Sequence, residues 1–318
     1  MSTIDLFLQS YCYRHHYLHK LGYDVFSFLD RAAADGYTGV SINMNGPNYR
    51  QLSGTSPEHI CRVRDRLEAN NLRCDIETSG TDEAHLTTIL KVCETLGVEQ
   101  ARTYMRHDGS PEETVARTIA DLRQAAPMYR AAGVRLLLEN HEDFTGAEMA
   151  TIMRGVDMEP VGALYDYGNS MMVAEQPETA LEAMLPFIRS VHLKDHACRR
   201  HADGTVEILG VPIGSGVLPI ADLTRRLVAN GLDRILLSNV WAYRCPVRDW
   251  RGGAKWGEGV FHGDDQDLGP MLRPWDAPEW EKSDLPRLLA LEDEACRFAQ
   301  TWLRKTLKEI GVDVVSRG

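Results

Sequence analysis

The chain has 318 residues, of which 43% are hydrophobic, and its formal net charge at pH 7 is −11. This length is usual for one α/β barrel with insertions, and the hydrophobic content is enough for a substantial core. Nucleic acid and anionic membrane surfaces are excluded as partners, because binding either would need a basic field to offset the phosphate charge.

The first residues and the cysteines bear on the compartment. The start of the chain lacks a basic segment followed by an apolar one, and no window approaches about 18 uninterrupted apolar residues, so neither a signal peptide nor a membrane span is expected. The seven cysteines form no C-x-x-C pair and are odd in number, which favours reduced thiols over a disulfide framework. We therefore expect a cytoplasmic protein.

Short apolar segments alternate along the chain with amphipathic segments of helical period. The pattern predicts strands at residues 4–8, 39–42, 73–77, 100–105, 134–139, 162–166, 188–194 and 234–237. It predicts helices after them at residues 24–34, 57–69, 82–96, 111–132, 146–154, 177–185, 219–230 and 285–310. Eight such units predict a single (β/α)₈ TIM-barrel domain that spans residues 1–318.

Two segments interrupt this alternation. Residues 197–215 follow the seventh strand and contain Asp203-Gly204 beside an alternating apolar pattern, which predicts a β-hairpin lid over the barrel mouth. Residues 243–283 follow the eighth strand and form a loop far longer than usual, rich in Gly, Asp, Pro and Trp. We expect this loop to cap the site, and its tryptophans to pack internally or to form contacts in a homo-oligomer.

Polar residues stand at the carboxyl ends of three neighbouring strands. Glu139, Asp166 and His192 each end or nearly end an apolar run, and the three runs are about one βα unit apart. The loops after the strands form the active face of such a barrel, so these side chains are expected to converge there. Two carboxylates and an imidazole can hold one divalent cation, with Mn²⁺ or Mg²⁺ preferred over a metal that favours thiolates.

Four short motifs resemble, in the same order, those of the xylose isomerase-like TIM-barrel superfamily of sugar isomerases and epimerases: LENH at 138–141, YDYGN at 165–169, VHLKD at 191–195 and GSG at 214–216. The resemblance spans nearly the whole chain. It implies that Glu139, Asp166 and His192 bind Mn²⁺, or else Mg²⁺ or Co²⁺. The ion would polarise the oxygens of a keto-sugar, so that proton removal beside the carbonyl gives a stabilised enediolate.

The chain departs from the family pattern at two positions. Ser238 stands where the resemblance places a glutamate, which is the fourth metal ligand and often a base. A hydroxyl is a poor metal ligand, so Ser238 is a weak candidate for the fourth ligand. Either Asn239 or water completes the metal shell in its place, or the serine weakens the enzyme. Asn169 stands where aldose isomerases carry a histidine, and we take it as a candidate substrate contact.

Without the carboxylate on the eighth strand, another residue has to act as the base. His141 is the best candidate, because it lies two residues beyond Glu139 and is expected to share its strand face, and an imidazole titrates near neutral pH. The alternative is that His141 only orients a ligand by a hydrogen bond. Lys194 shares a face with His192 and is expected either to assist catalysis at the substrate or to pair with a carboxylate.

Further candidate substrate contacts lie at the ends of other strands. Arg102 and Arg106 flank the end of the fourth strand, with Tyr104 between them, and are expected either to bind an anion or to form ion pairs of the barrel. Glu77, His15 and Trp241 follow the third, first and eighth strands. Glu77 is more often a hydrogen-bond acceptor that supports the structure than an acid.

The substrate is expected to be a small carbohydrate. Relatives with a Glu-Asn-His fifth strand and an Asn-Val-Trp eighth strand include sugar-acid decarboxylases and deglycosidases of 3-keto-glycosides. The resemblance therefore favours a lyase that acts on a keto-sugar or a sugar acid by decarboxylation or elimination. A ketose isomerase or epimerase is the first alternative, and a barrel that binds sugar without turnover is the second. DNA-repair endonucleases of the superfamily are disfavoured because they need a basic groove.

Overall fold

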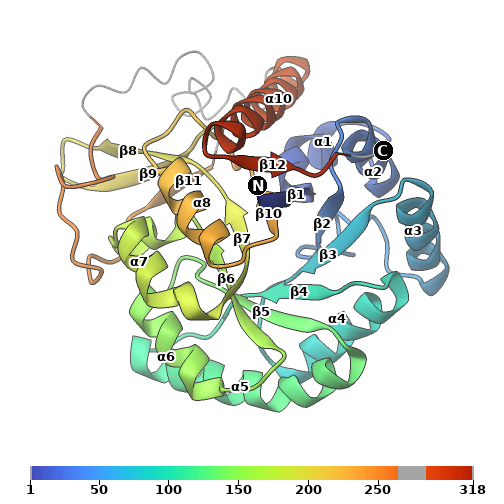
Figure 1. Cartoon of the computed structure of the whole chain (residues 1–318), viewed down its shortest axis with the longest axis horizontal. Coiled ribbons are helices and arrows are strands. Elements are labelled where there is room, and N and C mark those ends of the chain that lie inside the picture. The colour runs from blue at the N-terminus through green and yellow to red at the C-terminus, as the bar shows by residue number, and fades with distance from the viewer. Residues whose placement is uncertain (1, 242, 264–283, 317–318) are drawn as a thin grey trace.

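Eight short apolar segments of the described chain form parallel strands that pair edge to edge into a closed barrel (Figure 1). The computed structural model describes residues 2–241, 243–263 and 284–316. The pairing of the first and last barrel strands closes the ring, with Leu6 opposite Ile235. The barrel strands are β1 (Ser2–Gln9), β2 (Gly39–Asn43), β3 (Arg73–Glu77), β4 (Gln100–Thr103), β5 (Arg135–Glu139), β6 (Val161–Asp166), β7 (Ile188–Leu193) and β10 (Arg234–Leu237).

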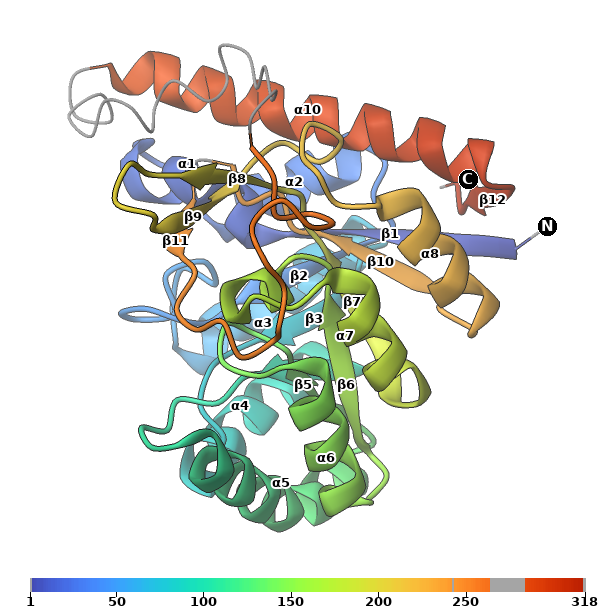
Figure 2. The same ribbon diagram turned by 90° about the vertical axis from the view of Figure 1, so that its left-hand side faces the viewer.

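Helices follow the strands and surround the barrel (Figures 1 and 2). They are α2 (Val25–Ala34), α3 (Pro57–Ala69), α4 (Glu83–Leu96), α5 (Pro111–Ala132), α6 (Gly146–Val156), α7 (Pro177–Met184), α8 (Ile220–Ala229) and α10 (Leu285–Glu309). Ser110 begins α5 with a capping box, because its side chain accepts from the backbone of Glu113 while the Glu113 side chain bonds back to the cap. The predicted TIM-barrel fold is confirmed, with element ends that differ by a few residues.

The strands are buried on both faces, as parallel strands in a barrel must be. Leu136, Leu137 and Leu138 of β5 are all fully buried, the first and third in one core cluster. Close packing also explains Gly39 at the start of β2. A Cβ atom there would lie only 2.4 Å from the ring of Phe7 on β1, so a larger residue would push the two strands apart.

Several short elements, most of them near the two ends of the chain and others around α7, were not predicted. A 3₁₀ turn, η1 (Ser10–Tyr13), and a short helix, α1 (Arg14–His19), follow β1, and β12 (Val312–Val314) pairs with the outer end of β1. The long helix α10 runs across one side of the molecule beside α1 (Figure 2). Two further 3₁₀ turns, η2 (Asn169–Val173) and η3 (Leu185–Phe187), flank α7. A pattern of three to six residues is too short to give a periodic signal.

The predicted hairpin after the seventh strand is present as β8 (His196–Arg200) and β9 (Val206–Gly210). A third strand, β11 (Arg244–Pro246), comes from the long loop after β10 and pairs with β9. Residues 264–283 of that loop, with Trp275 and Trp280, lie outside the described residues. Within the described part of the chain, no helix combines the length and the apolar character that a membrane crossing requires.

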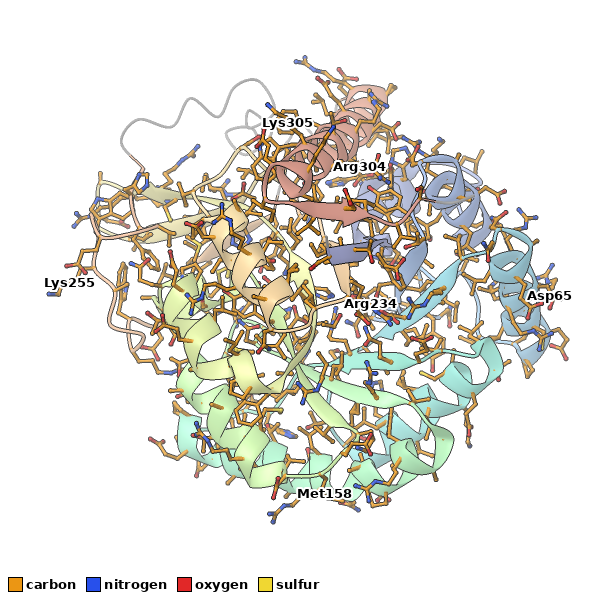
Figure 3. All side chains as sticks on the ribbon, in the orientation of Figure 1. Asp65, Met158, Arg234, Lys255, Arg304 and Lys305 are labelled. Atoms are coloured by element: carbon orange, nitrogen blue, oxygen red, sulfur yellow. The ribbon has the colours of Figure 1, made fainter. Side chains whose placement is uncertain are left out.

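A buried polar network fills the amino-terminal end of the barrel. Arg234, at the start of β10, lies near the middle of the ring of strands (Figure 3). It donates to Asp75 of β3 at 3.1 Å and to Glu99 at 2.9 Å, and Gln100 also donates to Asp75 at 2.7 Å. This network is far along the strands from their carboxyl ends, where the predicted site residues lie.

Candidate metal centre

Glu139, Asp166 and His192 come together at the carboxyl ends of β5, β6 and β7. One ligand atom from each residue lies within 4.8 Å of the others, and all three side chains are buried. The strands bring them together because β5 pairs with β6 and β6 pairs with β7, with Asp166 directly opposite His192. These three residues, called the triad below, could hold one metal ion.

The ring of His192 lies between two groups of carboxylates. Its Nδ1 atom is 3.1 Å from Oε1 of Glu139 and 3.7 Å from Oδ2 of Asp166. Its Nε2 atom is 2.8 Å from Oε1 of Glu77, which Ser41 also contacts at 2.5 Å. A histidine ligand commonly has a carboxylate on its second ring nitrogen, which fixes the ring and increases its basicity. Glu77 therefore holds the ring of His192 so that its Nδ1 atom faces the other two triad residues.

The buried carboxylates have too few hydrogen bonds. Oε2 of Glu139 and Oδ2 of Asp166 accept no hydrogen bond from the described residues, although neither atom reaches solvent. Their cationic neighbours are Nε of Arg102, 3.1 Å from Glu139, and Nζ of Lys194, 2.8 Å from Asp166. Two buried carboxylates and an imidazole, with ligand atoms within 4.8 Å of one another, are a donor set that suits a divalent cation, so the residues present fit a metal.

The charges of the cluster keep its acids ionised. Burial opposes this, but Arg102 and His192 lower the pKa of Glu139 well below its usual range and that of Glu77 to about 2. Burial also disfavours a charged His192, but Glu77 and Glu139 raise its pKa well above its usual value. Ionised carboxylates are the form that binds a cation.

The eighth strand supplies no carboxylate to this cluster. The hydroxyl of Ser238 is buried and donates to Oε1 of Gln9, and the amide of Gln9 donates to Glu77 at 2.5 Å. The side-chain oxygen of Asn239, the alternative candidate for the metal shell, accepts from the backbone of Ile213 at 3.3 Å. Ser238 nevertheless lines the cavity above the triad.

A cavity of about 540 Å³ opens above the triad. Its lining contains seven of the predicted site residues: Glu139, His192, His141, Lys194, Arg102, Arg106 and Ser238. A cavity of this size takes a small molecule.

His141 reaches this cavity from a turn rather than from a strand. β5 ends at Glu139, and the backbone N–H of His141 bonds back to the Glu139 carbonyl at 2.9 Å, so strand alternation is not what places it. Its ring stacks on Tyr104 with a centroid distance of 3.8 Å and an interplanar angle of 8°. Burial, with Lys194 and Arg102 nearby, lowers the pKa of His141 to about 4. The imidazole is therefore neutral near pH 7 and can accept a proton.

Lys194 and Asn169 brace the triad. Besides its pair with Asp166, Lys194 donates to Oδ1 of Asn169 at 3.1 Å. The amide of Asn169 in turn donates to Oε1 of Glu139 at 3.2 Å. Lys194 also lines the cavity, whereas Asn169 is not among the described residues of the lining.

Besides Asn169, three predicted substrate contacts lie away from the described cavity lining. Glu77 is fully buried behind His192. The ring of His15 packs against Trp241 at 6.1 Å, and Trp241 packs on Leu288 of α10. These two residues therefore join the start of the chain to the last helix.

Some lining residues were not predicted, among them Arg14, Arg50 and Glu142. Arg50 lies in the loop after β2, where no periodic pattern marks a side chain that points inward. Glu142 directly follows the LENH motif and could have been noticed. Its carboxylate accepts from the hydroxyl of Tyr243 and from the guanidinium of Arg248, and both donors come from the loop after β10.

The chain belongs to the xylose isomerase-like TIM-barrel family, whose model matches residues 29–260. It is 26% identical over 205 residues to the uncharacterized protein YihM of Escherichia coli, which covers 64% of this chain. It is 25% identical over 173 residues to the 3-oxo-isoapionate decarboxylase of Pectobacterium atrosepticum, which covers 54% of this chain. The matched segments span 63% and 62% of those two relatives, so less than two thirds of each.

Solved structures share the fold at low sequence identity. The IOLI protein with a bound zinc atom is 14% identical and superposes with a TM-score of 0.65 over 96% of this chain and 99% of its own. D-psicose 3-epimerase in the presence of D-fructose is 12% identical, with a TM-score of 0.63 over 96% and 99%. At this level of identity, the similarity shows the fold alone.

Proposed function

We propose that this chain is a divalent-metal-dependent enzyme that acts on a keto-sugar or sugar acid through an enediolate. The enediolate would form either by loss of carbon dioxide or by removal of a proton beside the carbonyl, which is followed by elimination. One observation carries the proposal: two residues of the triad, Glu139 and His192, line a cavity that His141 also lines. The family contains enzymes, and a relative 25% identical to this chain is a decarboxylase, which supports the lyase outcome.

Glu139, Asp166 and His192 would hold the ion, and we propose Mn²⁺ because the donors are two carboxylates and one imidazole. When bound, a divalent ion supplies Lewis-acid stabilisation of the negative charge that develops on the substrate oxygens. Glu77 fixes the ring of His192. In an elimination, the neutral imidazole of His141 takes the proton beside the carbonyl, whereas in a decarboxylation a proton has to be returned to the carbon that loses carbon dioxide. Stacking on Tyr104 holds the His141 ring in place.

The missing carboxylate on β10 supports cleavage over epimerisation. An epimerase must remove a proton on one face of the substrate and return it on the other, which needs two acid–base groups. Ser238 cannot act as the second group at neutral pH, and its hydroxyl is engaged by Gln9. A decarboxylation or elimination needs one proton acceptor or donor at the reacting carbon, and His141 can be that group.

A sugar-binding barrel without turnover is the second candidate. The observation that favours it is that Arg102 and Lys194 already pair with Glu139 and Asp166 and could stand in for a metal. The two candidates predict different metal contents.

Elemental analysis of the purified protein tests the proposal. The wild type should carry about one Mn²⁺ per chain after dialysis against the ion, and Asp166→Ala should lose it. Asp222→Ala, which removes an exposed carboxylate on α8, is the matched control and should keep the metal. Stoichiometric manganese in Asp166→Ala would place the site elsewhere, and none in the wild type would favour the sugar-binding barrel. Release of carbon dioxide from a 3-keto sugar acid would then separate a decarboxylase from an epimerase.

A further inference from the structure

The lining of the cavity is rich in positive charge, although the whole chain carries a net charge of −11. The described lining residues include five cationic side chains but only two carboxylates, those of Glu139 and Glu142. Two of the five, the buried Arg102 and the half-buried Lys194, are paired with carboxylates around the triad. The remaining positive charge lies nearer the mouth, on the loops after β1, β2 and β4.

Two of these mouth residues, Arg50 and Arg106, form no ion pair in the described part of the chain, although Asp143 is near enough to Arg106 for the two charges to interact. Within residues 2–241, 243–263 and 284–316, no carboxylate lies within 4.0 Å of the guanidinium of Arg50 or of Arg106. A chain with this surplus of acidic residues could readily have paired them. An unpaired guanidinium at the rim of a ligand cavity is suited to an anionic group on the ligand.

Arg106 is held in position rather than free to move in solvent. Its Nη2 atom donates to the hydroxyl of Tyr104 at 2.5 Å, and its guanidinium carbon lies 4.5 Å from the centre of the same ring. Tyr104 is buried and stacks on His141. Arg106, Tyr104 and His141 thus form a continuous path from the mouth to the proposed base. A preorganised guanidinium loses less entropy when it binds than a mobile one.

We propose that Arg50 and Arg106 bind an acidic group of the substrate, so that the enzyme selects a sugar acid or another anionic keto-sugar over a neutral ketose. This inference rests on the proposed function, because it places the keto carbon at the triad and a separate acidic group, distinct from any carboxylate that is lost there, at the mouth. The hydroxyls of a neutral sugar would leave both guanidinium groups without an ion pair. A carboxylate or a phosphate ester would neutralise them through charge-assisted hydrogen bonds.

Calorimetric titration with three keto-sugars tests this selectivity: D-fructose, which is neutral, D-fructuronate, which carries a carboxylate in place of the terminal hydroxymethyl group, and D-fructose 6-phosphate. The wild type should bind at least one of the two acids about tenfold or more tightly than D-fructose, since each 1.4 kcal/mol is a factor of ten. In Arg50→Gln and Arg106→Gln the preference should fall to about threefold or less. Arg225→Gln, which removes an exposed arginine on α8, is the matched control and should keep it.

Tyr104→Phe adds a finer test, because it keeps the ring on which His141 stacks and removes the hydroxyl that holds Arg106. Its preference for the acid should fall between that of the wild type and that of Arg106→Gln. The arginines are exposed, so these variants are expected to fold, and thermal unfolding checks this.

The outcomes separate cleanly. Tight binding of the phosphate with weak binding of D-fructuronate would support the proposal and identify the acid as a phosphate ester. Equal affinity for D-fructose and both acids, binding of neither acid, or a preference that survives both arginine substitutions would overturn it. Each titration is run on metal-free and on Mn²⁺-loaded protein. A wild type that binds Mn²⁺ without preferring the acids refutes this inference alone, whereas one that prefers the acids without binding Mn²⁺ refutes the metal-dependent function alone.

Discussion

At the scale of single residues, the serine on the eighth strand changes the chemistry of the site most. The family pattern would place a carboxylate at Ser238, and the structure has instead a chain of hydrogen bonds from Ser238 through Gln9 to Glu77. The carboxylate at the end of that chain reaches His192, on the ring nitrogen that faces away from Glu139. The site therefore keeps a third buried acid, but this acid orients a ligand of the triad.

Ser238→Glu should tighten metal binding, because it adds an anionic ligand at the end of β10 and the cavity beside Ser238 has room for the longer side chain. We expect the Kd for Mn²⁺ to fall on the order of tenfold or more, measured by calorimetric titration. Ser238→Gln has the same shape without the charge and should give a much smaller change. An unchanged Kd in Ser238→Glu would mean that residue 238 does not face the ion.

His141→Asn should separate binding from rate. The substitution keeps a polar side chain but removes the proton acceptor, so Mn²⁺ and sugar binding should stay near the wild type while turnover falls on the order of a hundredfold. Exchange of the proton beside the carbonyl with deuterium, followed by NMR, measures the step directly. A variant with wild-type exchange would remove His141 from the mechanism and leave Lys194 as the candidate.

At the scale of elements, the loop after β10 is fastened to the loops after β5 and β6. Arg248 and Tyr243 bind Glu142, and the backbone of Gly252 bonds to the carbonyl of Val173 at 2.8 Å. Glu175, just before α7, is buried at 4% exposure beneath this loop and accepts from the backbone N–H of Gly146 at the start of α6 at 2.8 Å. The loop therefore covers the junction of two βα units.

Glu175 should make stability depend on pH. Burial raises the pKa of its carboxyl from 4.5 to about 7, so the folded protein holds this proton more tightly than the unfolded chain does. Its contribution to stability is present below pH 4.5 and is lost as the pH rises toward 7. In Glu175→Gln the amide oxygen can still accept from Gly146, and the loss should vanish.

Denaturant titrations at pH 5 and pH 8 measure this effect. Relative to Glu175→Gln, the wild type should lose roughly 2 kcal/mol of unfolding free energy between the two pH values. Glu68→Gln, which removes a carboxylate with 72% side-chain exposure, serves as the control and should show no comparable difference. Parallel curves for the wild type and Glu175→Gln would show that Glu175 is already ionised in the folded state.

At the scale of the whole molecule, a stabilising polar network and the candidate metal site lie at opposite ends of the barrel. Its amino-terminal end holds the buried pair of Arg234 and Asp75, which links β10 to β3 across the ring. Its carboxyl-terminal end holds the triad and the cavity. Substitutions at one end should therefore leave the other largely unaffected.

Arg234→Leu should destabilise the protein by about 3 kcal/mol or more, because it leaves the Asp75 carboxyl buried without its main partner. Adding Asp75→Leu should recover much of the loss, since an apolar pair can replace a buried ion pair. Chemical denaturation measures both variants, and Mn²⁺ titration should find the metal site intact in each. A double variant whose destabilisation equals or exceeds the sum of the two single ones would contradict this account.

The sequence alone determined the alternation of strands and helices, and with it the barrel and the end at which the site lies. Parallel strands buried on both faces leave a local apolar signal, and their carboxyl ends must meet at one edge, so the grouping of Glu139, Asp166 and His192 follows from their positions in the chain. The hairpin of β8 and β9 had an equally local signal in its turn and alternation.

Only the tertiary structure decided what each polar residue contacts. Arg102 and Arg106 look equivalent in the sequence, but one is buried against Glu77 and Glu139 and the other is exposed at the mouth on Tyr104. His15 and Trp241 follow barrel strands, as candidate site residues do, yet they pack against each other and Trp241 packs on α10, which lies far along the chain from His15. The position of a residue along its strand determines at which end of the barrel it lies. The partner of its side chain depends on packing between segments far apart in the chain, and no local sequence pattern encodes such packing.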